Sequence, residues 1–176
     1  MQESLKLAER TGDVVLQSRC LTYLTVLYRK RGEVEKVRQY IPRCEKVAST
    51  GQMIEYLATA KANIAWIAWR EGNVLETEGN GRAALEIWQQ LPAGHASAAF
   101  HWTALWPLIG VSVARDHIPE AIDYARALLE PTRQRLPEAL TVILEKAINT
   151  WEGGDAKETC TNLNQALELA QKMGYL

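Results

Sequence analysis

The sequence has little of what several large classes of protein require. It has only three cysteines and one phenylalanine among 176 residues. Cys20, Cys44 and Cys160 are far apart and lack C-x-x-C spacing, which favours reduced, buried thiols in a cytoplasmic protein over a disulfide framework. No run of 18 or more apolar residues is present, so we expect no membrane span. The start, MQESLKLAER, lacks the apolar stretch of a secretory signal.

An excess of charge of one sign is also missing. The formal net charge of the chain is −1. Residues 1–50 carry a net charge of +4, from ten Lys and Arg against six Asp and Glu, and the remaining residues carry −5. A solvated helix face explains an excess of this size. An RNA-binding helical repeat would depend on many phosphate contacts, so near-neutral charge argues against that function and predicts no nucleic-acid partner.

Apolar residues, by contrast, are plentiful. They make up 47% of the chain, enough to bury the core of one domain, and six of them are tryptophans. No segment alternates apolar and polar residues long enough to indicate a strand. Composition and pattern together predict an all-α protein.

Turn signals recur along the chain with a period near forty residues. One kind lies at Arg31-Gly32-Glu33, Glu71-Gly72-Asn73, Arg115-Asp116-His117 and Gly153-Gly154-Asp155. A second kind alternates with it, near residues 12, 51, 94, 131–137 and 174. Two breaks in each period indicate two helices in each repeat.

These breaks predict nine helices in a single repeat domain over 1–176. A half-repeat at 2–10 precedes helix pairs at 14–49, 52–90, 96–130 and 136–173, whose first helices end at 31, 71, 115 and 152. Asp13 and Asp155 are expected to be N-caps. Pro42 and Pro107 fall inside predicted helices, and each is expected to kink or split its helix.

The spacing of apolar and small residues resembles the tetratricopeptide (TPR) repeat. The positions that carry the resemblance are Leu21, Leu24, Tyr28, Gly32, Val37, Ile41 and Cys44 in the first full repeat, and Ala147, Gly154, Leu163 and Ala166 in the last. The period exceeds the ~34 residues of a standard TPR, so the helices are expected to be about a turn longer. The resemblance implies a right-handed α-solenoid of antiparallel helix pairs with about 4 to 4.5 repeats.

Two segments, 3–13 and 165–174, are similar to the "ALxLAxxxG" ends of repeats in the TPR regions of bacterial signalling ATPases, adenylate/guanylate cyclases and LuxR- or MalT-type regulators. The resemblance implies the regulatory or scaffold part of such a signal-transduction protein, with any activity in domains outside this chain. Residues 2–10 look like the second helix of a pair that lacks its first. We therefore expect a fragment of a longer protein.

Catalytic and cofactor motifs are not evident. His95, His101 and His117 do not stand at metal-ligand spacing. The glycine-containing run 78–82 lacks both the Lys-Ser/Thr and the preceding strand of a phosphate-binding loop. We expect Gly81 to leave a volume that a neighbouring tryptophan fills. The sequence predicts no enzyme, no metal and no cofactor.

Most tryptophans fall at positions that line the concave face of a TPR array. In the register set by the turns, the candidate partner-binding residues are Val26, Arg29, Lys30, Trp66, Trp69, Arg70, Trp106, Val113 and Trp151. Tryptophan is common at binding hot spots. The alternative is that these rings fill the core between helices. Greater exposure of Trp69 and Trp151 than of Trp66 and Trp102 would favour a groove, and burial of all six would contradict it.

The predicted function is therefore a non-enzymatic protein-interaction module. Its concave face would bind a peptide, a helix or another domain of the same parent chain. The alternative is a module for homo-oligomerisation, such as a homodimer, in which exposed terminal helices stack on a second copy.

Overall fold

The computed structural model describes residues 1–92 and 100–176, and over these ranges its secondary structure is entirely helical. The described residues form nine helices: α1 (Gln2–Thr11), α2 (Val14–Lys30), α3 (Val34–Thr50), α4 (Ile54–Arg70), α5 (Val74–Gln89), α6 (Trp102–Ala114), α7 (Ile118–Leu128), α8 (Glu138–Glu152) and α9 (Ala156–Lys172). The all-α prediction is confirmed. Residues 96–99 of the predicted helix 96–115, and His95, lie outside the described residues.

Short local signals set the helix boundaries. Gly32 and Gly72, with φ of 70° and 75°, occupy the turns after α2 and α4, where a left-handed backbone conformation is needed. Asp116 takes the same conformation, with φ of 58°, at the turn after α6. Asp13 and Asp155 accept hydrogen bonds from the backbone N–H three residues on, which confirms both predicted N-caps.

The two prolines inside helices do not split them. Helix α3 continues through Pro42, and helix α6 continues through Pro107. Pro107 has no N–H to donate to the carbonyl of Thr103, four residues earlier. The Arg29 guanidinium of α2 donates to that carbonyl instead, over 2.7 Å. A side chain from another helix thus satisfies an acceptor that the proline left free.

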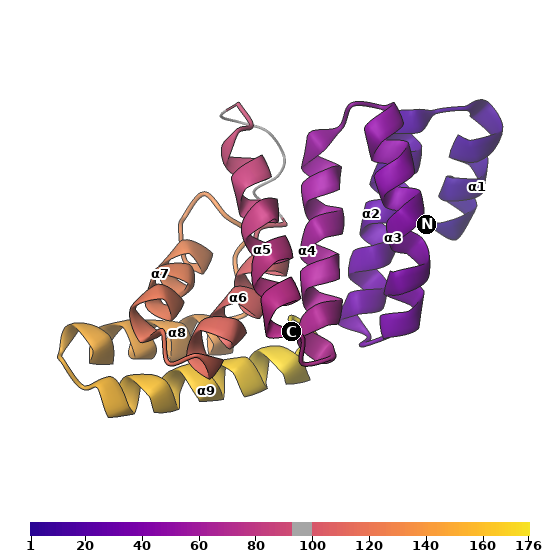
Figure 1. Ribbon diagram of the computed structural model, residues 1–176. Helices are drawn as coiled ribbons and strands as arrows, with labels where there is room; N and C mark the ends of the chain where they lie inside the picture. The colour runs from indigo at the N-terminus through magenta and orange to yellow at the C-terminus, as the bar shows by residue number, and fades with distance from the viewer. Residues whose placement is uncertain (93–99) are drawn as a thin grey trace.

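Consecutive helices pack against each other along the chain, and α4 also packs against both α2 and α6 (Figure 1). The last helix pair, α8 and α9, is placed differently from the earlier pairs. Its second helix, α9, packs against α6. Its first helix, α8, begins only after the long connection 129–137 that follows α7. Figure 1 shows α9 crossing at a steep angle to α4 and α5 and ending beside the lower end of α4.

The main hydrophobic core runs through the whole array, and a smaller cluster lies between α4, α5 and α6. Gly81 of α5 permits close packing of α6: a Cβ there would lie 2.8 Å from Leu108 Cγ. Leu108, and not a tryptophan as predicted, fills the volume beside Gly81. In the described part of the chain no helix is both long and apolar enough to cross a membrane.

Candidate functional site

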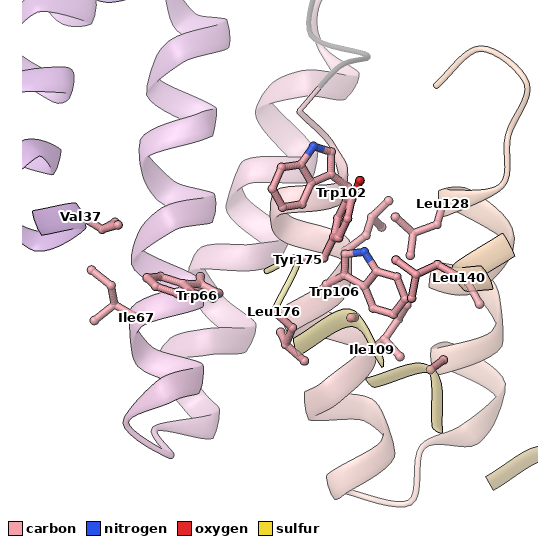
Figure 2. Close-up of a cluster of buried hydrophobic side chains, with 14 of the residues drawn as sticks. Val37, Trp66, Ile67, Trp102, Trp106, Ile109, Leu128, Leu140, Tyr175 and Leu176 are labelled. Atoms are coloured by element: carbon pink, nitrogen blue, oxygen red, sulfur yellow. The ribbon is translucent and has the colours of Figure 1, made fainter. Parts of the chain in front are cut away.

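The six tryptophans divide into a buried and a half-buried group. Trp66 and Trp106 have no exposed surface, and Trp88 and Trp102 are 3% and 5% exposed. Trp69 and Trp151 are half-buried. Figure 2 shows Trp66 and Trp106 enclosed among core side chains. Trp66 and Trp106 are therefore core residues in this conformation and present no surface to a partner.

Trp69 forms one wall of a shallow groove at the ends of α4 and α6. Its ring lies against the backbone of Gly110, where an added Cβ would be 2.7 Å from the ring. The groove has a volume of about 230 Å³. We call it the Trp69 groove; its lining residues are Trp69, Gly110, Val113, Ala114, Asn164, Leu167, Glu168, Gln171 and Leu176.

Arg29 of α2 is buried, at 1% exposure. Its guanidinium donates to the carbonyl oxygens of Thr103 at 2.7 Å and Tyr175 at 3.0 Å, and more weakly to that of Ala62 at 3.4 Å. It also lies over the rings of Trp66 and Trp102, 5.4 Å and 5.1 Å from their centroids. Burial holds the pKa of Arg29 well below its usual value.

Arg29 has no carboxylate partner among the described residues, and its Nε atom has no hydrogen-bond acceptor there. Carbonyl dipoles and indole faces balance its charge in place of an anion. Arg29 is thus a buried cation that joins α2, α4, α6 and the segment after α9.

Lys30 follows Arg29 in α2 and is half-buried. Its ammonium lies 2.8 Å from the ring centroid of Tyr175 and 4.7 Å from that of Trp102. Burial, with a smaller contribution from the charge of Arg29, lowers the pKa of Lys30 to about 8. The rings of Trp102 and Tyr175 meet edge to face, with their centroids 4.9 Å apart. Figure 2 shows these two residues beside each other. We call Arg29, Lys30, Trp66, Trp102 and Tyr175 the Arg29 cluster.

The other residues that were predicted to bind a partner lie in different parts of the structure. Val26 is half-buried and packs against both hydrophobic clusters. Arg70 is exposed, with its guanidinium 5.9 Å from the ring centroid of Trp66. Trp151, on α8, packs against the main core and does not line the Trp69 groove. The structure thus brings Trp69 together with Val113, and Arg29 together with Lys30 and Trp66.

Sequence reasoning missed the contribution of α9 and of the residues after it. Tyr175 and Leu176 are 8% and 4% exposed, although they follow the last predicted helix. The available signal was an aromatic–aliphatic pair directly after the glycine turn at Gly174. Such a pair outside a helix needs a surface on which to bury itself.

A separate network of charged side chains joins α5, α6 and α7. Arg82 donates to Glu120 at 2.6 Å and pairs with Glu78 at 2.8 Å, while Ser112 and Tyr124 also donate to Glu120. Burial raises the pKa of Glu120, but these three hydrogen bonds outweigh it and hold the pKa below its usual value. The carboxylate is thus engaged as a structural acceptor. The described residues contain no cluster of His, Cys, Asp and Glu suited to a metal ion.

Comparison of the chain with protein-family models, with curated proteins and with solved structures gives no match.

Proposed function

We propose that the chain is a non-enzymatic protein-interaction module that binds a peptide or helical segment at the Trp69 groove. The observation that supports this is the position of Trp69, which is half-buried, lies against Gly110 and lines the groove. A tryptophan fixed in this way loses little freedom when a partner covers it, and therefore contributes strongly to binding.

The volume and lining of the groove favour the binding of one side chain of a protein partner over the binding of a metabolite. Its volume, about 230 Å³, lies below the roughly 300–1,000 Å³ of typical small-molecule pockets. Apolar groups from Trp69, Val113 and Leu167 line it, while Asn164 and Glu168 are exposed polar residues beside them. An apolar centre with a polar rim is the usual anatomy of a protein interface.

The wider proposal follows from the TPR-like pattern of the sequence. Its elements are a right-handed solenoid, a cytoplasmic location and a role as the regulatory or scaffold part of a bacterial signalling protein such as a cyclase, an ATPase or a transcriptional regulator. The partner is then a protein or another domain of the parent chain, and no cofactor takes part.

Peptides selected from a random displayed library against the full chain provide the test. Affinity of a selected peptide, measured by fluorescence anisotropy, is expected to fall at least tenfold in Trp69→Ala, which removes the anchor. Ala114→Arg, which obstructs the groove from an exposed position, is expected to do the same without touching the core. Leu75→Ala is the matched control, because Leu75 is 73% exposed on α5 and outside the groove. Equal affinity in all four proteins would contradict the proposal.

The alternative function, self-association, is favoured by a different observation. Leu7 and Val15, near the first turn of the chain, are each 56% exposed. Stacking of a second copy on α1 would cover such side chains. Sedimentation over a concentration series distinguishes the two functions, because a particle that stays at 19.8 kDa excludes self-association.

A further inference from the structure

The Trp69 groove carries one charged side chain. Among the residues that line it, Glu168 is charged, and the side chains of the others are apolar or neutral. Glu168 is exposed on α9, and no side chain of the described residues forms an ion pair or a hydrogen bond with its carboxylate. The groove thus combines apolar side chains with one carboxylate.

Cations close to the groove in the sequence do not neutralise this carboxylate. Arg70, Arg115 and Lys172 each follow a lining residue, but none of them lines the groove. Arg115 pairs with Glu78 of α5. The Arg70 guanidinium lies 5.9 Å from the ring centroid of Trp66. Lys172 is exposed and forms no ion pair with a described residue. The lining of the groove therefore keeps a negative charge.

The neutral polar groups of α9 add hydrogen-bond acceptors beside this charge. Asn164, Glu168 and Gln171 follow each other at the spacing that places side chains on one face of a helix. The Asn164 Nδ2 atom donates to the carbonyl of Cys160 at 2.9 Å, which leaves the Oδ1 acceptor of the same amide available to a ligand. This face of α9 suits a group that donates hydrogen bonds and carries a positive charge.

The rest of the lining is largely apolar and aromatic. Trp69 supplies an indole ring, and the face of such a ring attracts cations. Val113 and Leu167 supply aliphatic surface. The side chains of arginine and lysine match this combination, because each packs an aliphatic stem on apolar groups and holds a cation at its tip. The chain itself contains such a contact, since the Lys30 ammonium lies 4.7 Å from the ring centroid of Trp102.

We propose that the Trp69 groove selects a basic side chain of its protein partner, arginine or lysine, and that Glu168 is the residue that determines this selection. The stem of the basic residue packs on Trp69, Val113 and Leu167, and its cation reaches the Glu168 carboxylate. The groove volume of about 230 Å³ suits one such side chain. The inference rests on the proposed function, because it names the kind of residue that the groove binds.

The first test is selection from the random displayed peptide library against three proteins: the unmodified chain, Glu168→Gln and Glu145→Gln. Glu145 is the matched control, because it is exposed on α8, lies outside the groove and forms no ion pair with a described residue. Both variants therefore remove one exposed carboxylate. Arginine or lysine is expected to recur at one position of the peptides selected by the unmodified chain and by Glu145→Gln. This enrichment should disappear with Glu168→Gln.

The second test measures the affinity of one selected peptide by fluorescence anisotropy. Its basic residue is exchanged for a neutral residue of nearly the same shape, citrulline for arginine or norleucine for lysine. The exchange is expected to weaken binding to the unmodified chain and to Glu145→Gln at least fivefold, and binding to Glu168→Gln at most twofold. Added salt should weaken the original peptide's binding to the unmodified chain more than its binding to Glu168→Gln, because salt screens exposed charges.

Peptides that lose affinity in Trp69→Ala but bind Glu168→Gln as tightly as the unmodified chain would overturn this inference and leave the proposed function intact. Selected peptides without enrichment of arginine or lysine, anchored in the groove by an apolar residue, would overturn it in the same way. Peptides that keep their full affinity in Trp69→Ala would instead contradict the proposed function. The two failures are thus distinguishable.

Discussion

At the scale of residues, the most informative pair is Arg29 and Pro107. Neither is easily accommodated alone: a buried cation without a carboxylate is costly, and a proline inside a buried helix leaves a carbonyl without its donor. Together they compensate, because Arg29 donates to the carbonyl of Thr103 that Pro107 leaves free. The continuity of α6 thus depends on a residue 74 positions away.

This compensation predicts a coupling between the two positions. Arg29→Met is expected to lower the free energy of unfolding by about 3 kcal/mol, since it leaves buried carbonyls without donors. Pro107→Ala supplies an N–H to Thr103, so the cost of Arg29→Met should fall by about 1 kcal/mol in that background. Urea unfolding of the four proteins measures the difference. Pro42→Ala, in the other proline-containing helix, is the control, and the same relief there would refute the coupling.

Lys30 predicts the pH dependence of stability. Its pKa in the folded chain is about 8, against about 10.4 in an unfolded chain. Between these values the unfolded chain binds more protons, so the free energy of unfolding rises with pH. We expect Lys30 to contribute a rise of about 0.5–1 kcal/mol from pH 8 to 9.5, reduced for the half-exposed position of the ammonium. The buried Cys44 thiol, whose pKa is raised to about 11, contributes with the opposite sign over the same range. Urea unfolding should therefore show the contribution of Lys30 as the difference in slope between the unmodified chain and Lys30→Met, in which the free energy of unfolding rises less or falls more with pH.

At the scale of elements, local signals predicted most of the fold. Gly32 and Gly72 mark their turns because the backbone there is left-handed, which depends only on the residue itself. The packing of α9 on α6 was not predicted, because it follows from contacts between distant segments after a long connection. The same limit applies to the candidate site. Trp69 and Val113 could be placed together by helical register, whereas the burial of Tyr175 on Lys30 could not.

Helix α5 offers a matched pair of glycines that tests the packing between elements. Gly79 is exposed with open space around its Cα, so Gly79→Ala should raise the free energy of unfolding by about 0.5–1 kcal/mol through helix propensity. Gly81→Ala should lower it by about 1–3 kcal/mol, because the added methyl collides with Leu108. Thermal unfolding compares the two. Stabilisation by both substitutions would show that α5 and α6 are not in such close contact.

At the scale of the whole molecule, α9 and the segment after it connect the two ends of the array. Arg29 in α2 holds carbonyls from α4, α6 and Met173–Leu176, and the Trp69 groove combines residues of α4, α6 and α9. The groove and the Arg29 cluster meet at Leu176. A partner at this junction would contact both halves of the chain.

The most direct test of this account is an amide chemical-shift map of the full chain on addition of a library-selected peptide. We expect the largest shifts at the ends of α4 and α6 and along the groove side of α9, together with the indole N–H of Trp69. Shifts confined to α1, α3 or α8, with the Trp69 indole signal unchanged, would contradict a binding site at the Trp69 groove.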